Sequence, residues 1–469
     1  MLARRKLSGR VFGDIRLYIG LFFLVRLFGI THPPLETGHN WRQALTAMIA
    51  RNFVEQKASL FYPQIDYAGS GPGFIGSEFP FFNYLIYLFS EAAGYTHWYG
   101  RLINLMVSSL GIYFFCKLIS RLTTRSIAFN AGIILLSSIW FAFSRKIMPD
   151  TFSLSLVIIG FYYGYEYLIS GRKYQLVVYF VFTTLGILCK IPALYLLAIL
   201  GMLPWIKEIP TSRKAAVIVL SGASFSLVSL WYFVWVPHLV ETYGNQLYFP
   251  RGLAEGLSEI LSMPGAFFRN FYFNAFHSYV AFIAFGAGMY LLFRQDLRKL
   301  GVGLLLLTIS FLLFVLKTGI VFPLHNYYII PFVPVMALVA AIALDRIPAP
   351  WRYLVLVVIA GEGITNQQHD FFIKDKEGYK MAVQHLTETH TDKHDLIVIN
   401  GGPSPQEIYL AHRKGWSVGN EKITPEALRT YAGAGARYLV IDQRSFPDSI
   451  SFLPLVAREG DFSLYSLTP

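Results

Sequence analysis

The chain has 469 residues, and its composition excludes most classes of soluble protein. Apolar residues make up 54% of the sequence and charged residues only 14%, with a mean hydropathy of +0.47. Soluble globular proteins average about 25% charged residues, so this deficit indicates a membrane protein. The formal net charge of +12 could suggest a nucleic-acid partner. The lysines and arginines, however, mostly stand between apolar segments, which is the pattern of membrane topology rather than of nucleic-acid binding.

The N-terminus and the two cysteines narrow the class further. The N-terminal sequence MLARRKLSGR is basic, and the apolar stretch after it lacks a small-residue cleavage site. We therefore expect a retained first helix and not a cleaved signal peptide. Cys116 and Cys189 lie inside apolar segments, so the sequence predicts neither a disulfide framework nor a zinc site made of cysteines.

Apolar segments recur along the chain at a length of about 20 residues, which suffices for a helix to cross a bilayer. About eleven such spans are predicted. They lie near residues 14–32, 101–121, 126–144, 151–170, 174–190, 191–206, 214–236, 276–294, 299–317, 325–345 and 352–365. The predicted fold class is a polytopic α-helical membrane protein, with residues 1–365 as its transmembrane domain.

Basic residues between the predicted spans set the expected orientation. With eleven spans, all of these clusters fall on the same side of the membrane as the N-terminal Arg4, Arg5, Lys6 and Arg10, and the positive-inside rule makes that side the cytoplasm. The clusters are Lys117, Arg121 and Arg125; Arg172 and Lys173; Lys207, Arg213 and Lys214; Arg294, Arg298 and Lys299; and Arg346 and Arg352.

The first exoplasmic loop, about residues 32–100, is long for a polytopic protein unless it carries chemistry. It contains two amphipathic segments, 41–55 and 79–94, which are predicted to be helices lying at the outer membrane surface. The apolar core of the second segment is too short to cross the bilayer. Counting it as a span would also put the basic clusters on opposite sides of the membrane.

The composition changes abruptly after residue 365, which predicts a small exoplasmic α/β domain over residues 366–469. HDLIVINGG and ARYLVID are typical of buried strands, and PSPQEIYLAHRKG and TPEALRTYAGAG of short helices. The segment NGGPSPQ superficially resembles a phosphate-binding loop. It matches neither the P-loop nor the Rossmann glycine pattern, so nucleotide binding is not expected there.

The first loop gathers four candidate catalytic residues: Glu78, Asp66, Glu36 and His39. A carboxylate or an imidazole in this position could accept the proton of an acceptor hydroxyl or amine. Each has a simpler alternative role. Glu78 stands just before a helix and could cap it, Asp66 could be a turn residue, and His39 could be structural.

Basic and polar side chains near the expected outer face form a second group of candidates, for binding a phosphate or a lipid headgroup. They are Arg42, Gln43, Arg145, Lys146, Asp150, Lys190, His325 and Tyr327. Arg145 and Lys146 fall on the outer side against the charge rule, and Lys190 is an ionisable residue at the end of a span, which favours a function. Arg42 could instead extend toward headgroups, and the tyrosine could belong to an aromatic belt.

The segments HNWRQALTAMIARNF, GSEFPFFNYL, MPD, LCKIP and HNYYIIPFVP, in this order, resemble bacterial glycosyltransferases of the C superfamily. The similarity is to the family that includes dolichyl-phosphate-mannose–protein mannosyltransferases and the lipid A aminoarabinose transferase, and it covers the membrane portion of the chain. The resemblance implies a polyprenyl-phosphate sugar donor, catalysis on the outer face and inversion at the anomeric carbon.

Residue roles follow from the resemblance at four positions. Glu78 corresponds to a glutamate near the metal or the donor head, which makes a divalent metal ion a candidate cofactor. Asp150 corresponds to the acidic residue ahead of the fourth span, and Lys190 to a phosphate-facing lysine. His325 and the tyrosines after it correspond to the basic and aromatic start of a late span.

The start of the first loop helix departs from the family pattern. Many relatives carry an acidic residue there as the candidate base, whereas this chain has HNWRQ. The base therefore remains open among Glu36, His39, Asp66 and Glu78.

The sequence thus predicts a membrane glycosyltransferase of a bacterial inner membrane that moves a sugar from a polyprenyl phosphate to a lipid, glycan or protein acceptor. The alternative is a transporter or flippase of a lipid-linked saccharide, which would need ionisable residues within its spans. Arg26 and Glu166 lie within predicted spans and keep this alternative open. A receptor whose tail binds a ligand would not need eleven spans.

Overall fold

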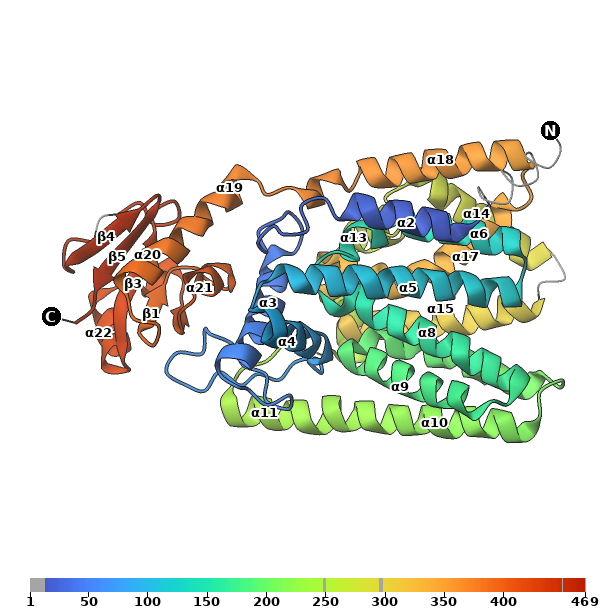
Figure 1. Cartoon of the computed structure of the whole chain (residues 1–469), viewed down its shortest axis with the longest axis horizontal. Coiled ribbons are helices and arrows are strands. Elements are labelled where there is room, and N and C mark those ends of the chain that lie inside the picture. Colours follow the sequence, from blue (N-terminus) through green and yellow to red (C-terminus); the bar gives the residue numbers. More distant parts are fainter. Residues whose placement is uncertain (1–12, 248–249, 295–297, 449, 469) are drawn as a thin grey trace. The chain divides into compact units, whose positions relative to one another are not determined.

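The computed structural model describes residues 13–247, 250–294, 298–448 and 450–468 (Figure 1). The N-terminal Arg4, Arg5, Lys6 and Arg10 lie outside the described residues. The chain divides into two compact units. We call the first the helical unit, which comprises residues 1–30, 101–234 and 248–369, and the second the loop–tail unit, which comprises residues 31–100, 235–247 and 370–469.

The helical unit is built from helices that run side by side (Figure 1). Local sequence explains several of their ends: Pro149 begins α8, and Gly171, with φ 74°, follows its last residue. The helices are α2 (Ile15–Arg26), α5 (Trp98–Leu122), α6 (Arg125–Ser137), α7 (Trp140–Phe143), α8 (Pro149–Ser170), α9 (Lys173–Cys189), η1 (Ile191–Trp205), α10 (Thr211–Leu230), η2 (Trp231–Trp235), α12 (Leu253–Leu261), α13 (Pro264–Arg269), η3 (Asn270–Asn274), α14 (Tyr279–Arg294), α15 (Arg298–Thr318), α16 (Val321–Leu324), η4 (Asn326–Phe332), α17 (Val333–Leu344) and α18 (Ala349–Thr365).

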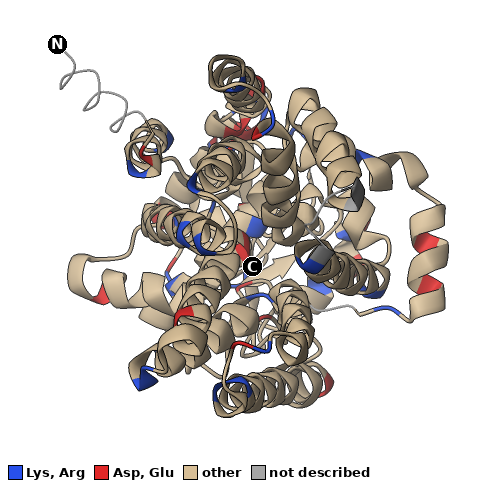
Figure 2. Cartoon of the chain, turned by 90° about the vertical axis from the view of Figure 1, so that its right-hand side faces the viewer, with Lys and Arg blue, Asp and Glu red and all other residues tan. Residues whose placement is uncertain are grey.

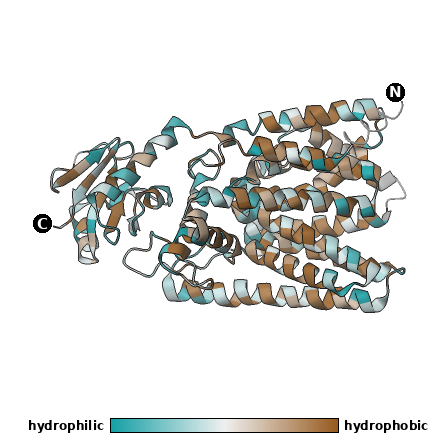
Figure 3. Ribbon diagram, in the orientation of Figure 1, coloured by the Kyte–Doolittle hydropathy of each residue, from teal (hydrophilic) through white to brown (hydrophobic). Residues whose placement is uncertain are grey.

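Five helices among the described residues are long and apolar enough to cross a membrane, and a bent pair would make a sixth. The apolar character of the bundle is visible in Figure 3. The five are Trp98–Leu122, Pro149–Ser170, Thr211–Tyr243, Lys299–Thr318 and Asn326–Leu344. Each of the eleven predicted spans overlaps a helix, but several of these helices are shorter. The prediction of a polytopic, mostly helical membrane protein is confirmed at this level.

Residues 237–275 lie between the spans predicted at 214–236 and 276–294, and the described part of this segment is largely helical. It contains α11 (Val236–Tyr243), α12, α13 and η3. The pair Pro264–Asn274 and Tyr279–Leu292 is bent by 92°. These helices are short, and α11 and α13 each have a proline in their first two positions. A helical repeat of apolar residues therefore cannot be recognised in such short segments of sequence.

Helix ends in the helical unit carry many of its basic residues. Figure 2 views the bundle along its helices and shows Lys and Arg residues at several helix ends. Arg121 and Arg125 lie at the short connection between α5 and α6, and Arg172 and Lys173 lie at the one between α8 and α9.

The tail contributes a five-stranded sheet to the loop–tail unit, in the order β2-β1-β3-β5-β4. Strands β2 (Gly415–Ser417), β1 (Leu396–Ile399) and β3 (Ala436–Asp442) are parallel, and β5 (Phe462–Ser466) and β4 (Leu455–Glu459) are antiparallel additions. The other elements of this unit are α3 (Asn40–Glu55), α4 (Phe81–Ala93), α11, α19 (Asp375–Gly378), η6 (Tyr379–Met381), α20 (Ala382–His390), α21 (Gln406–Ala411), η7 (Asn420–Lys422) and α22 (Pro425–Gly433).

The predicted strands and helices of the tail are present as β1, β3, α21 and α22. Central strands β1 and β3 are apolar and buried, as expected for parallel strands covered on both faces. Strand β2 has three residues, and every residue of β4 is partly exposed or exposed. Neither strand therefore has the apolar alternation by which strands are usually predicted.

The first loop pairs with the edge of the tail sheet. The Gly69 N–H donates to the Gly415 carbonyl at 2.7 Å, and the Gly415 N–H donates to the Asp66 carbonyl at 2.9 Å. Both glycines have positive φ. A Cβ on Gly69 would lie 2.5 Å from Trp416 Nε1, and one on Gly415 would lie 1.8 Å from the Ile397 carbonyl oxygen, so only glycine fits. First loop and tail thus fold as one body.

Candidate functional site

Helix α3 is enclosed by protein, and its predicted polar surface is not observed. Every residue from Arg42 to Phe53 is buried. Arg42, Arg51 and Asn52 donate hydrogen bonds to groups within the protein, so their spacing does not reflect contact with water or headgroups. Helix α4 does show a one-sided pattern: it buries Phe82 and Ile86 and exposes Leu88 and Phe89.

Glu78 is held by the first turn of α3. Arg42 Nη2 donates to both carboxylate oxygens of Glu78, at 2.7 and 2.8 Å. The N-cap of α4 is Pro80, without a side-chain cap, so the geometry orients Glu78 toward Arg42 and gives no support to the capping alternative. Gln43, the next residue of α3, is fully buried.

Asp66 is held at the last turns of α3 by a closed set of hydrogen bonds. Arg51 Nη2 donates to Asp66 Oδ2 at 2.7 Å, and Asn52 Nδ2 donates to Oδ1 at 2.8 Å. The other end of the guanidinium donates to the Tyr409 carbonyl at 2.8 Å and lies 4.5 Å from the centre of the Tyr409 ring. Burial alone would lower the pKa of Arg51, but the Asp66 charge raises it above the usual value.

Glu36 and His39 lie on the chain leading into α3. Glu36 is fully buried, its carboxylate lies 3.0 Å from His32 Nδ1, and its backbone forms an isolated bridge with Ile373. His39 immediately precedes α3 with φ 53°, a left-handed conformation that is uncommon outside glycine.

The structure does not bring the two loop carboxylates Glu78 and Asp66 to one point. Their partners Arg42 and Arg51 are about 13 Å apart along the axis of α3, at a rise of about 1.5 Å per residue.

In the helical unit, four of the predicted residues meet where α8, α9 and η4 begin or end. Lys190 follows the last residue of α9, and its ammonium lies 3.7 Å from an oxygen of Asp150 in the first turn of α8. It also lies 5.6 and 5.7 Å from the ring centres of Tyr327 and Tyr328. The His325 ring stacks on Tyr327 at 5.5 Å. Both charged side chains are buried, so this cluster is a cation and a carboxylate enclosed by aromatic rings.

Arg145 and Lys146 lie in the turn between α7 and α8, and both are buried. Arg145 Nε donates to the Arg26 carbonyl at 3.0 Å and Nη2 to the Phe28 carbonyl at 2.8 Å, which fastens the end of α2. The Lys146 ammonium lies 5.3 Å from the centre of the Phe143 ring.

Asn104 on α5 positions this turn, and the sequence analysis did not single it out. Its side-chain amide donates to the carbonyls of Phe143 at 3.0 Å and Lys146 at 2.9 Å. Its carbonyl oxygen accepts from Thr151 at 2.9 Å. An amide inside a predicted span must find partners within the protein, and that was the available signal. Arg51 was also missed as a candidate, because residues 41–55 were predicted only to form an amphipathic helix at the membrane surface.

Comparisons with known proteins were made for the whole chain. Residues 77–235 match the family model described as dolichyl-phosphate-mannose-protein mannosyltransferase. No curated protein sequence matches the chain. The crystal structure of ArnT from Cupriavidus metallidurans bound to undecaprenyl phosphate has a TM-score of 0.63 at 14% identity, over 96% of this chain and 98% of that one.

Two further solved structures are similar over most of the chain. The Archaeoglobus fulgidus oligosaccharyltransferase in complex with Zn and sulfate has a TM-score of 0.60 at 12% identity, over 90% of this chain and 67% of that one. The arabinofuranosyltransferase AftD from Mycobacteria has a TM-score of 0.58 at 15% identity, over 97% of this chain and 40% of that one. The chain therefore shares its fold with these glycosyltransferase structures, and residues 77–235 match the mannosyltransferase family model. The predicted resemblance is confirmed.

The match to the family model includes only some of the candidate site residues. It includes Glu78, Asp150 and Lys190, whereas Asp66 and His325 lie outside residues 77–235.

The metal site suggested by the resemblance can be compared with the geometry. Within the described ranges, no three His, Cys, Asp or Glu side chains converge in a way that could hold a metal ion. Glu78, the residue expected near a metal, accepts both hydrogen bonds from Arg42. These residues do not fit a metal site, and the mechanism below uses none.

The two charges that favoured a transporter have structural partners near helix ends. Arg26 is the last residue of α2 and donates to the Phe22 carbonyl at 2.9 Å and to the Ser144 hydroxyl. Glu166, in the last turns of α8, pairs with Arg121 at 3.1 Å. These contacts weaken the argument for an ion pathway through the helical unit.

Proposed function

We propose that this protein is an integral membrane glycosyltransferase that moves a sugar from a polyprenyl-phosphate donor to an acceptor on the outer face of the membrane. The observation that carries this proposal is the cluster of Lys190, Asp150, His325 and Tyr327. Support comes from two similar structures, ArnT bound to undecaprenyl phosphate and the archaeal AglB in complex with a dolichol-phosphate.

Lys190 has the chemistry that the leaving group requires. When the bond between the sugar and the phosphate breaks, the phosphate keeps the electron pair, and a nearby cation stabilises that charge. An ammonium has three N–H donors, so Lys190 can keep Asp150 and bind a phosphate oxygen at the same time. The tyrosine rings fix the position of the ammonium through cation–π contact.

Glu78 is the base in this proposal, because it is the most accessible of the three loop carboxylates. The side chains of Glu36, Asp66 and Glu78 are 0%, 4% and 18% exposed. Asp66 is closed off by its partners Arg51 and Asn52, which suits a structural role. Glu78 is oriented by Arg42 and still reaches the surface.

The reaction is then a single displacement. The acceptor oxygen or nitrogen attacks the anomeric carbon, its proton passes to Glu78, and the polyprenyl phosphate departs with the bonding electrons. Attack from the face opposite the leaving group inverts the anomeric carbon.

The finer topology belongs to the same proposal. We assign eleven spans, a cytoplasmic N-terminus, and an outward position for the first loop and for residues 366–469, with residues 1–365 forming the transmembrane domain. The helix ends that carry Arg121, Arg125, Arg172 and Lys173 support this orientation. A bacterial inner membrane, with the site facing the periplasm, follows if the protein is bacterial. The acceptor is a lipid, a glycan or a protein.

The test uses purified full-length protein with a panel of radiolabelled polyprenyl-phosphate sugars and a membrane extract as the source of acceptors. Glu78→Gln should reduce the release of sugar by about 10²-fold or more, because removal of a general base costs about that factor. Glu91→Gln, an exposed glutamate on α4, is the matched control and should retain activity.

Two results would count against the proposal. Full activity of Glu78→Gln would show that another residue is the general base. Intact donors, together with movement of the labelled lipid between the leaflets of liposomes, would favour the transporter.

A further inference from the structure

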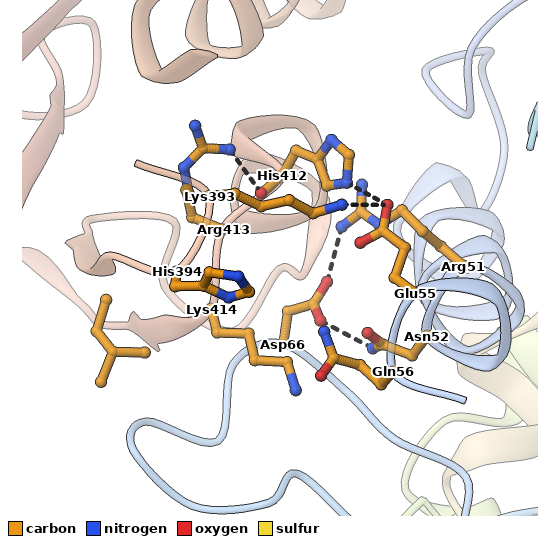
Figure 4. Close-up of a pocket in the computed structure, with 11 residues that line it drawn as sticks. Arg51, Asn52, Glu55, Gln56, Asp66, Lys393, His394, His412, Arg413 and Lys414 are labelled. Carbon is orange, nitrogen blue, oxygen red and sulfur yellow. Dashed lines mark hydrogen bonds and ion pairs between the residues drawn. The ribbon is translucent and has the colours of Figure 1, made fainter. Parts of the chain in front are cut away.

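The loop–tail unit contains a cavity of about 90 Å³ between the end of α3 and the tail (Figure 4). The first loop and the tail both contribute to its wall. The lining residues are Arg51, Asn52, Glu55, Gln56 and Asp66 from the loop, and Lys393, His394, Leu396, His412, Arg413 and Lys414 from the tail. A polar cavity of this size has room for a few water molecules or one small ion.

Positive charge exceeds negative charge in this wall. Of the loop residues, Asp66 is neutralised by Arg51 at 2.7 Å. Glu55 is contacted by His412 at 2.7 Å and by Lys393 at 3.6 Å. Asp66 and Glu55 are the only carboxylates in the cavity lining. The other two cations of the lining, Arg413 and Lys414, therefore have no carboxylate partner within it.

Arg413 is a buried cation whose hydrogen bonds go to neutral groups. Its guanidinium donates to the Thr391 hydroxyl at 2.9 Å, and to the carbonyls of His412 at 2.9 Å, Thr387 at 3.1 Å and Thr391 at 3.0 Å. Burial lowers the pKa of Arg413, with carboxylates farther away compensating only in part. Its hydrogen bonds are satisfied, but its charge is not neutralised by direct contact.

Lys414 is the cation best placed to bind a ligand. Its ammonium makes no hydrogen bond or ion pair with any residue that the structure describes, and the side chain is only partly exposed. Figure 4 shows it extending past Asp66 toward Gln56. The backbone beneath it is fixed, because the next residue, Gly415, hydrogen-bonds to Asp66.

We propose that this cavity binds an oxyanion, a carboxylate or phosphate group carried by the acceptor, with Lys414 as its direct ligand and Arg413 supplying positive potential behind it. The anion site itself does not depend on the proposed function. Only the assignment of the oxyanion to the acceptor rests on it. The site lies on the tail side of the loop–tail unit and is separate from the Arg42–Glu78 pair. It gives the tail a role in choosing acceptors that bear negative charge.

Anion binding should be measured directly on the full-length protein in nanodiscs of phosphatidylcholine. The soluble probes are inorganic phosphate and galacturonate, with galactose as the neutral counterpart. Calorimetric titration and thermal unfolding are the readouts, because a ligand that binds the folded state raises the melting temperature. Nanodiscs containing phosphatidate test a lipid headgroup as the source of the oxyanion.

The variant that decides is Lys414→Gln. It should weaken anion binding by about tenfold or more, since charge-assisted hydrogen bonds are the strong ones, while Lys414→Arg should restore it. Lys422→Gln removes an exposed lysine of the same domain outside the cavity and should bind as the unmodified protein does. The melting temperatures without anion should be the same for all variants, which confirms folding.

The outcomes separate this proposal from the proposed function. Lys414-dependent binding of phosphate or galacturonate supports a soluble or glycan-borne oxyanion, and Lys414-dependent stabilisation only by phosphatidate supports a lipid headgroup. If no probe depends on Lys414, the inference is overturned. Anion binding that persists in a protein unable to release sugar from any donor would overturn the transferase and leave the anion site standing.

Discussion

Two buried pairs of a cation and a carboxylate, Arg51–Asp66 and Lys190–Asp150, differ in the distance between their charged atoms. In the loop–tail unit, Arg51 and Asp66 are 2.7 Å apart, and Asn52 and the Tyr409 carbonyl take up further hydrogen bonds. In the helical unit, Lys190 and Asp150 are 3.7 Å apart, which is longer than a hydrogen bond. The Lys190 ammonium also lies 5.6 and 5.7 Å from the ring centres of Tyr327 and Tyr328.

The difference separates a structural pair from one suited to chemistry. The guanidinium of Arg51 is planar and donates to acceptors on two sides, so it holds two chain segments in a fixed position. A lysine ammonium is a compact charge on a flexible stem, and it can redirect its donors when a phosphate arrives. Residue type and burial alone would place both pairs in the same category.

Removing the closed pair should have the larger effect. Arg51→Met leaves Asp66 buried without its cation, and breaking a buried pair on one side costs about 3–5 kcal/mol. The free energy of unfolding should fall by that amount, and sugar transfer should be lost because the protein is unfolded. Denaturant or thermal unfolding in detergent measures this effect.

The double variant Arg51→Met/Asp66→Leu serves as the control for that result. It leaves no unpaired buried charge, so it should be more stable than Arg51→Met alone. Equal stability of the two variants would show that the joint does not depend on this pair.

Lys190→Gln should instead separate activity from stability. Transfer should fall by about 10²–10³-fold, the usual cost of removing one group that stabilises charge in the transition state. The melting temperature should fall less than in Arg51→Met, because Asp150 remains at the start of α8, where the helix dipole favours a negative charge. Lys207→Gln, at an exposed position of the same unit, should change neither quantity.

A large loss of stability in Lys190→Gln, with transfer per folded molecule unchanged, would remove the distinction between the two pairs.

The smallest effect is expected at Glu55, and it depends on pH. Burial alone would raise the pKa of Glu55, but the hydrogen bond and charge of His412, with Arg51 and Lys393, lower it below the usual value of 4.5. The folded protein therefore gains stability from ionised Glu55 above pH 4.5, and this gain is lost as the pH falls through the lower folded-state pKa. Melting temperatures from pH 3 to pH 7 should show this acid loss reduced in Glu55→Gln.

An unchanged acid profile in Glu55→Gln would mean that the contact with His412 does not help to join the loop to the tail.

Much of the fold could be predicted from the sequence, because apolar length and basic residues are direct physical signals. The spans overlap helices, and the apolar runs of β1 and β3 became central strands. The cluster around Lys190 could also be anticipated, since an ionisable residue at the end of a span is costly unless it has partners.

Contacts between distant segments could not be predicted in the same way. Residues 41–55 were predicted to form a helix at the membrane surface. In the structure, Arg51 of this helix donates a hydrogen bond to the Tyr409 carbonyl, 358 positions away in the chain. Asn104 was passed over because a single amide does not change the hydropathy of a span. The pairing of Gly69 with Gly415 carries no local pattern, because it depends on the approach of two backbones and not on side chains.

That pairing has a consequence for how the protein is made. Asp66 is synthesised long before Gly415, so the first loop must wait for the last part of the chain before its backbone partners exist. During this interval a chaperone or the membrane surface would have to shield the loop. The three-residue strand β2 would, in turn, be an open sheet edge in a tail separated from the loop, and such edges invite aggregation. Truncation before the tail should therefore harm the first loop as much as the tail itself.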